Sequence, residues 1–236
     1  MNRIVVFDMD ETLGTFFHLS VFLKALTTLF PYLDYDAEFN KTMNLFSILH
    51  RPYIKDILRY VCKARRNGNI SRIILYTNNR GDPSWARRIT GYFENVLKCK
   101  IFDDIIFAYM VNGKIIDGRR TTNDKTITDL RRCSRIANTT QICFIDDQYH
   151  EDMNHPNLTY IKVPPYNYSI GYHEMVTLYY SKYPICRNKT EFISNMVHYM
   201  NIMTPNVKRT TLKEYRNHIS ASKQLSEYIK IFCTSS

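Results

Sequence analysis

The chain has 236 residues, of which 44% are hydrophobic and 14% aromatic, so it can bury a core and is not an intrinsically disordered protein. This length fits one elaborated domain, or one domain with a small extension. The net charge of +10 favours acidic partners such as phosphorylated protein, nucleic acid or an anionic surface, and it is equally compatible with a generally basic soluble protein.

The cysteines and the start of the chain bear on the cellular compartment. Six cysteines are scattered without a Cys-x-x-Cys pair, which is typical of a reduced, intracellular protein. No signal peptide is recognisable, because acidic residues begin at position 8. The apolar stretch 16–30 is too short to span a bilayer and contains His18 and Lys24. We therefore expect a soluble protein of the cytoplasm or nucleus that does not act at a membrane.

Short apolar runs alternate with helical patterns along the first part of the chain. Residues 3–8 predict a buried strand, and residues 72–77 predict a second one. Helical spacing, capping residues and prolines predict helices at residues 20–30, from near Asp36, from Pro52 to Gly68, and from the N-cap Asp82.

The next part of the chain has a different pattern. Residues 104–117 hold two apolar runs around Asn112-Gly113, which is the strongest short-range signal for a β-hairpin. After the hairpin we predict a helix at residues 124–137, a third buried strand at 141–146 and a fourth strand at 158–163.

Strands that alternate with helices favour an α/β fold with a three-layer, Rossmann-like parallel sheet and crossover helices. We expect its core at residues 1–165, with a small helical insertion at 14–50 and a β-hairpin insertion at 100–122. Residues 166–236 are expected to form a helical C-terminal extension, in which Asn188 and Thr211 begin capping boxes.

Polar side chains follow three of the predicted strands, and sites in open parallel sheets form at the carboxyl ends of strands. Together with a lysine placed beside the same edge, the candidate residues are Asp8, Asp10, Thr77, Asn78, Lys125, Asp146 and Asp147. Clustered carboxylates repel unless a cation compensates them, and Mg²⁺ accepts carboxylates together with waters and phosphate oxygens. One carboxylate can attack phosphorus and a second can protonate the leaving oxygen, while hydroxyl and ammonium groups hold phosphoryl oxygens. The pattern predicts Mg²⁺-dependent phosphoryl chemistry.

Plainer interpretations exist for some of these residues. A calcium loop that begins at Asp8 is excluded, because Leu13 stands where glycine is needed and Leu19 stands where glutamate is needed. A solvated acidic turn is the alternative for the first strand end, and the polar residues at the other strand ends count against it. Arg119 and Arg120, after the hairpin, are interpreted as a solvated basic turn rather than as contacts to an anionic substrate.

Four motifs occur in order at these strand ends: "FDMDETL", "ILYTNN", "NDK" and "FIDD". In residues 3–150 they resemble the four motifs of the haloacid dehalogenase superfamily. The resemblance implies that Asp8 is the nucleophile and that Asp10 is the general acid/base, whose backbone carbonyl also binds Mg²⁺. It implies that Thr77 and Lys125 bind phosphate and that Asp146 or Asp147 completes the metal site. Asp10 favours a phosphatase or a phosphotransferase, because the dehalogenase and ATPase branches lack an aspartate there.

Asn78 has two open interpretations, since it can contact the phosphate or cap the following turn. A finer resemblance rests on "HRPYIKDILRYV", on the hairpin, and on "DKTITDL" before "CFIDD". These are similar to the small RNA polymerase C-terminal-domain phosphatases and their NLI-interacting-factor-like relatives. The chain departs from that pattern at Thr126 and at Asp147, where the group usually has asparagine. The resemblance implies a phosphoserine or phosphothreonine protein as substrate.

Two other classes of function stay open. A nucleic-acid-end phosphatase is favoured by the positive charge and disfavoured by the spread of that charge, which forms no clustered basic groove. A regulatory protein could keep the motifs without relevant turnover, but such a protein has no physical need for the complete motif set. The modest length of the insertions predicts a small cap and an open site, compatible with a macromolecular phosphoester.

Overall fold

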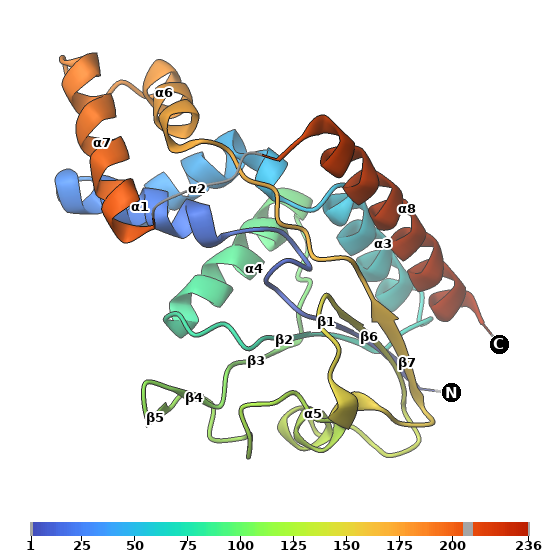
Figure 1. Ribbon diagram of the computed structural model, residues 1–236. Coiled ribbons are helices and arrows are strands. Elements are labelled where there is room, and N and C mark those ends of the chain that lie inside the picture. Colours follow the sequence, from blue (N-terminus) through green and yellow to red (C-terminus); the bar gives the residue numbers. More distant parts are fainter. Residues whose placement is uncertain (1, 205–209, 236) are drawn as a thin grey trace. The chain divides into compact units, whose positions relative to one another are not determined.

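The computed structural model describes residues 2–204 and 210–235. Its centre is a five-stranded, wholly parallel sheet in the order β3-β2-β1-β6-β7 (Figure 1). The strands are β1 (Arg3–Phe7), β2 (Arg72–Tyr76), β3 (Asp104–Ile106), β6 (Gln141–Asp146) and β7 (Leu158–Lys162). A small antiparallel hairpin consists of β4 (Met110–Val111) and β5 (Lys114–Ile115). The chain therefore has the predicted α/β fold.

The central strand explains why its sequence is a continuous apolar run. In β1, Ile4, Val5, Val6 and Phe7 are all fully buried, because the sheet is covered on both faces. Its neighbours are β2 and β6, and Phe7 pairs in register with Leu75 and with Ile145.

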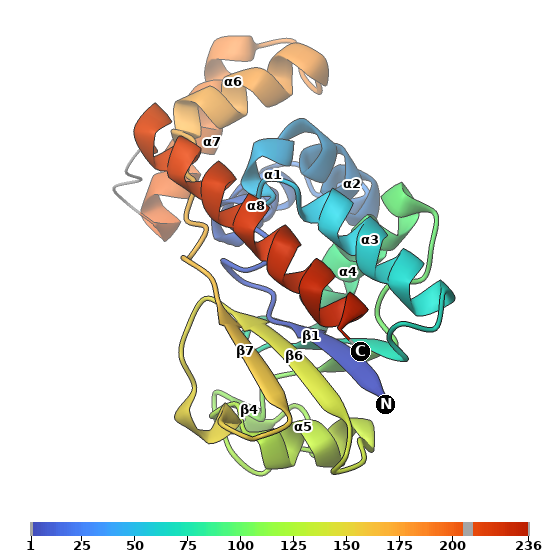
Figure 2. The same cartoon turned by 90° about the vertical axis from the view of Figure 1, so that its right-hand side faces the viewer.

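Helices cover both faces of this sheet (Figures 1 and 2). One face carries α5 (Ile127–Ser134), whose Leu130 and Cys133 join the apolar core beside the strands. On the other face lie α3 (Ile54–Arg66), α4 (Pro83–Leu97) and residues 217–234 of α8 (Leu212–Thr234). A three-residue 3₁₀ helix, η2 (Glu151–Met153), precedes β7.

The chain divides into two compact units. The sheet unit comprises residues 1–14, 51–166 and 217–236, and the helical unit comprises residues 15–50 and 167–216. The helical unit contains α1 (Phe17–Leu29), α2 (Tyr35–Leu45), η1 (Ser47–Leu49), α6 (Tyr172–Lys182), α7 (Lys189–Met203) and the first residues of α8. This grouping differs from the division expected at residue 165, which stays a prediction.

The core of the helical unit is aromatic and holds one buried acid. Phe22 packs on Tyr179 with ring centroids 5.2 Å apart, and Phe192 lies parallel to the Tyr179 ring. Glu38 is buried there and accepts hydrogen bonds from the Tyr179 hydroxyl and, at 2.7 Å, from Lys41 Nζ. No helix within the described ranges combines the length and the apolar character needed to cross a bilayer.

Several element boundaries differ from the sequence-based expectation, among them the start of α1 at Phe17 rather than at residue 20. Residues 104–106 form an edge strand of the main sheet, and the hairpin is confined to residues 110–115, where Asn112 and Gly113 have φ of 49° and 77°. Helix α3 begins at Ile54 rather than at Pro52, because Tyr53 takes a left-handed conformation with φ of 60°. Helix α5 begins after its N-cap Thr126, so it is shorter than the predicted 124–137.

Candidate active site

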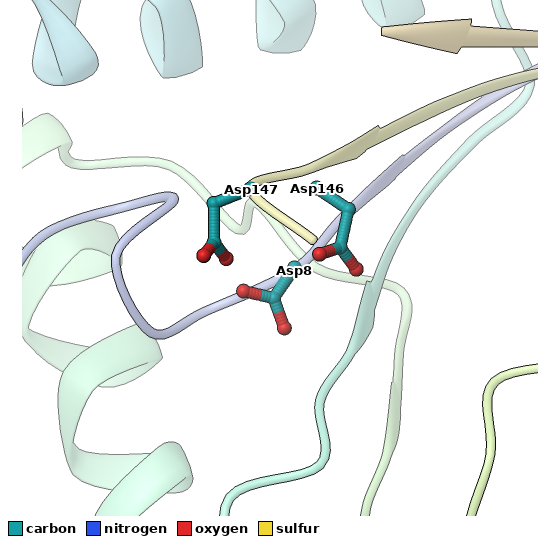
Figure 3. Close-up of side chains that lie close together, drawn as sticks. All are labelled: Asp8, Asp146 and Asp147. Atoms are coloured by element: carbon teal, nitrogen blue, oxygen red, sulfur yellow. The ribbon is translucent and has the colours of Figure 1, made fainter. Parts of the chain in front are cut away.

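Three carboxylates converge at the carboxyl edge of the sheet. Asp8 follows β1, Asp146 ends β6, and Asp147 comes next in the chain. One oxygen from each of the three lies within 4.8 Å of the others (Figure 3). The parallel pairing of β1 with β6 brings this about, because Phe7 and Ile145 are in register and the residues that follow them leave the sheet side by side.

Lys125 lies among these acids. Its Nζ is 2.6 Å from Asp8 Oδ1 and 2.6 Å from Asp146 Oδ2, and its side chain is buried. The rings of Tyr76 and Phe144 lie at 5.7 and 5.8 Å from the ammonium. The backbone beside the lysine is fixed, since the N–H of the next residue donates to the Tyr76 hydroxyl at 3.2 Å. The structure thus brings Asp8, Lys125, Asp146 and Asp147 together.

Burial makes ionisation of these acids unfavourable. It raises the pKa of Asp8 to about 8, with Asp146 and Asp10 adding to the effect and Lys125 opposing it. Burial likewise raises the pKa of Asp147 to about 6, and Asp146 adds to this. Burial acts to lower the pKa of Lys125, but the two carboxylates beside it outweigh that effect and the pKa is raised.

Asp146 has the opposite shift, and its cause is a dense set of hydrogen bonds. Burial acts to raise the pKa of Asp146, but donors outweigh it and the pKa is lowered. The donors are His150 Nε2 at 3.4 Å, Lys125 Nζ, and the Gln148 backbone N–H at 2.8 Å. Asp146 therefore favours the ionised form, as a ligand or an ion-pair partner must.

The donor set fits a divalent metal ion. When all three carboxylates are ionised, the cluster formed by the three aspartates and Lys125 has a formal charge of −3 + 1 = −2. Uncompensated buried charge is costly, so a cation is the natural complement of this cluster. All three groups offer oxygen, which is the ligand atom that hard cations such as Mg²⁺ and Ca²⁺ prefer.

Asp10 and Thr77 are connected through Asn79, which the sequence analysis did not single out. Asn79 Nδ2 donates to Asp10 Oδ2 at 2.8 Å, and the Asn79 backbone N–H donates to Thr77 Oγ1 at 3.0 Å. Burial raises the pKa of Asp10, while the bond from Asn79 acts to lower it. In "TNN" either asparagine is a candidate, so the sequence pattern alone does not tell them apart.

Asn78 is turned toward a buried arginine. Its Oδ1 accepts from Arg120 Nη1 at 2.7 Å. Arg120 also donates to the carbonyls of Phe107, Asn123 and Asp124, the last at 2.8 Å, and its side chain is fully buried. The interpretation of Arg120 as solvated is therefore wrong: it ties Asn78 to the segment that leads into Lys125.

Arg119, the neighbour of Arg120, is partly exposed and pairs with Asp104 at 3.0 Å and Asp117 at 2.7 Å. No sequence signal separates these two adjacent arginines. Only the fold buries one and leaves the other at the surface. The assigned phosphate contact of Asn78 stays a prediction, as do the roles of the other six candidate residues.

Arg51 fixes the loop that carries Asp10. Its Nε donates to the Thr12 carbonyl at 2.6 Å, and its Nη2 donates to the carbonyls of Glu11 at 2.6 Å and Pro164 at 2.8 Å. Glu11 is left-handed, with φ of 56°, so this tight loop needs such support. Burial lowers the pKa of Arg51 to about 10, which still leaves it charged at neutral pH. The Arg-Pro pair in "HRPY" is the sequence signal that could have identified it.

We expect Arg51→Met to destabilise the fold by about 2–4 kcal/mol, because it leaves three carbonyls without their charged donor. Turnover at the candidate site should fall roughly 10–100-fold through displacement of the loop. Urea unfolding and steady-state kinetics measure the two effects. Arg59→Met is the matched control, since Arg59 lies on α3, is 60% exposed and pairs only with Asp56 among the described contacts. Equal unfolding midpoints for the two variants would contradict the positioning role of Arg51.

Comparison with known protein families gave one match that spans most of the chain. Residues 3–182 match the model of the NLI interacting factor-like phosphatases. The match covers the sheet unit up to β7 and extends through α6. Searches among curated proteins and among solved structures found no match. With motifs, sheet and family model in agreement, the chain belongs to the NLI interacting factor-like phosphatases, a family of the haloacid dehalogenase superfamily, and it is a phosphatase.

Proposed function

We propose that the protein is a Mg²⁺-dependent phosphomonoester hydrolase that acts through an aspartyl-phosphate on Asp8. The observation that supports this most is the contact of Asp8 Oδ1 with Lys125 Nζ at 2.6 Å beside two further carboxylates. Among the described contacts no hydrogen bond reaches Asp8 Oδ2, so one oxygen is held and the other is available to attack.

The first step transfers the phosphoryl group to the enzyme. An oxygen of Asp8 attacks phosphorus, the bond from phosphorus to the ester oxygen breaks, and Asp10 gives its proton to that leaving oxygen. Lys125 and Thr77 hold the phosphoryl oxygens, on which negative charge is concentrated. Asn79 positions both the general acid and the phosphate-binding threonine, because it donates hydrogen bonds to Asp10 and to Thr77.

The second step releases phosphate. Asp10, now ionised, accepts a proton from a water that attacks phosphorus, and the bond from phosphorus to Asp8 breaks. The products are inorganic phosphate, free Asp8 and a protonated Asp10. Arg51 keeps the loop in place through both steps by its bonds to the carbonyls of Glu11 and Thr12.

Asp8, Asp146 and Asp147 would hold Mg²⁺, together with the backbone carbonyl of Asp10. When bound, the ion supplies charge that neutralises the phosphate oxygens and lets an anionic nucleophile approach them. Thr12 Oγ1 lies 3.5 Å from Asp147 Oδ1 and orients that carboxylate.

We propose phosphoserine or phosphothreonine in a protein as the substrate class, supported by the family match and by the net charge of +10. A phosphorylated nucleic-acid end is the second candidate, favoured by the same positive charge. A binding or regulatory role without turnover is disfavoured by the contacts that join Lys125 to two acids and Asn79 to Asp10.

The test is phosphate release from p-nitrophenyl phosphate, a phosphoserine peptide and a phosphorylated oligonucleotide, each with Mg²⁺ and with EDTA. We expect release only with Mg²⁺, and fastest from the peptide among the two biological substrates. Preference for the oligonucleotide with a steep salt dependence would move the assignment to nucleic-acid ends. Release that persists in EDTA would contradict the metal dependence.

Asp10→Asn is expected to slow hydrolysis of an alkyl phosphate by about 10²–10⁴-fold, because the alkoxide leaving group needs a proton. The loss with p-nitrophenyl phosphate should be at least tenfold smaller, since p-nitrophenolate leaves without protonation. Pre-steady-state kinetics on both substrates measure the first step. Asp56→Asn on α3 is the carboxylate-to-amide control, with an exposed side chain. An equal decrease in the rate of the first step for both substrates would exclude Asp10 as the general acid.

A further inference from the structure

Two cysteines that are distant in sequence lie in contact in the sheet unit. Cys62 is in α3 and Cys99 follows α4, and their Sγ atoms are 3.3 Å apart. Both are free thiols. The roughly 2 Å bond of a disulfide would need a closure of about 1.3 Å from the observed 3.3 Å.

Other contacts hold the two thiols at this place. Arg65, one turn after Cys62 in α3, donates to the carbonyls of Lys100 and of Ile101, the latter at 2.8 Å. Glu94 in α4 accepts from the backbone N–H groups of Ile101 and Phe102 at 2.9 and 3.1 Å. The segment after Cys99 is therefore anchored to both helices, and the thiol pair is a fixed feature of their packing.

The environments of the two thiols differ. Cys62 is 2% exposed, whereas Cys99 is partly exposed to solvent. Burial, followed by the proximity of Cys99, raises the pKa of Cys62 to about 12. Cys62 is thus protected from direct attack by an oxidant, and Cys99 is the thiol that a small oxidant can reach.

We propose that Cys62 and Cys99 form a peroxide-sensitive site at which a reversible disulfide joins α3 to the end of α4. The Cys99 thiolate attacks hydrogen peroxide, the O–O bond breaks, and a sulfenic acid forms with release of hydroxide, which becomes water. The Cys62 sulfur then attacks the Cys99 sulfur, the S–O bond breaks, and the hydroxyl leaves as water with the Cys62 proton. Two thiols lose two electrons, and one peroxide is reduced to two waters.

This site is separate from the phosphatase chemistry. Neither cysteine belongs to the carboxylate cluster or to its hydrogen-bond partners. Among the described contacts no other pair of cysteine sulfurs lies as close, and Cys143 and Cys233, which interact electrostatically, are both buried. We therefore expect oxidation to join Cys62 to Cys99, whose sulfurs are in contact and of which Cys99 is partly exposed.

The experiment treats the reduced 236-residue protein with a small molar excess of hydrogen peroxide, blocks the remaining thiols by alkylation, and maps the peptides by mass spectrometry without reduction. Relative to the untreated protein, we expect a mass lower by two hydrogens before alkylation and two fewer alkylated thiols. One crosslink should join the peptides of Cys62 and Cys99. The melting temperature should rise by roughly 5 °C or more and return after dithiothreitol. A crosslink between other cysteines, or six alkylated thiols after treatment, would overturn the proposal.

Variants separate the two steps. Cys99→Ser should lose both the crosslink and the thermal shift, whereas Cys186→Ser, which changes a cysteine of the helical unit, should keep both. Cys62→Ala should leave Cys99 as a sulfenic acid that a 1,3-diketone probe captures. Absence of that adduct in the folded variant, judged by circular dichroism, would contradict attack on Cys99.

Discussion

Asp8→Asn is expected to lower the turnover number for phosphomonoesters by at least about 10⁴-fold while leaving the fold intact. The amide has nearly the shape of the carboxylate but is not a nucleophile toward phosphorus. Lys125 keeps its contact with Asp146 at 2.6 Å, so its charge retains a partner in the variant. Phosphate release measures the loss, and thermal unfolding with circular dichroism measures the fold. Residual activity within tenfold of the wild type would exclude Asp8 as the nucleophile.

A direct assay for the covalent intermediate distinguishes loss of the nucleophile from loss of metal binding. Acid-quenched wild-type protein, taken during turnover, should carry phosphate that hydroxylamine removes, because an acyl phosphate reacts with that nucleophile. Asp8→Asn protein should carry none. Asp147→Asn is the informative comparison, since it alters a proposed metal ligand but retains Asp8. That variant should show a raised Mg²⁺ requirement and still form the phosphoenzyme at high Mg²⁺.

The strands at the centre of the fold could be predicted because burial on both faces requires an uninterrupted apolar run. β1 and β6 meet this condition, with every residue from Ile142 to Ile145 fully buried. β3 does not, since it has three residues at the sheet edge and only Ile106 is buried. Its membership in the sheet depends on pairing with β2, which a local pattern does not encode.

The candidate site could be located because parallel strands place their carboxyl ends at one edge of a sheet. That rule brings Asp8, Asp146 and Asp147 together without knowledge of any contact. It gives no information on the burial of charged side chains, which depends on tertiary packing. The rule therefore does not identify Arg51 and Arg120 as supports of the site. The pairing of residues 15–50 with 167–216 in one unit is equally non-local.

Lys125→Met is expected to destabilise the metal-free protein by about 3–5 kcal/mol, because removal of one partner leaves buried charge uncompensated. Methionine fills a similar volume and can pack between the rings of Tyr76 and Phe144, so the effect reports on charge rather than on a cavity. Urea unfolding in EDTA measures it. Lys24→Met, at an exposed position of α1, is the control, and its free energy of unfolding should lie within about 0.5 kcal/mol of the wild-type value.

A double-mutant cycle attributes this loss to the acids. Asp8→Asn introduced into the Lys125→Met protein removes one of the repelling carboxylates. It should raise the free energy of unfolding of that protein by at least about 1 kcal/mol, whereas Asp8→Asn in the wild-type protein should not stabilise by that amount. Added Mg²⁺ should likewise stabilise Lys125→Met more than wild type, since the ion then replaces the positive charge that the lost ammonium placed beside Asp8 and Asp146. Additive effects of the two substitutions would show that Lys125 and Asp8 act independently. Such a result would contradict the arrangement in which one ammonium contacts Asp8 and Asp146 at equal distances of 2.6 Å.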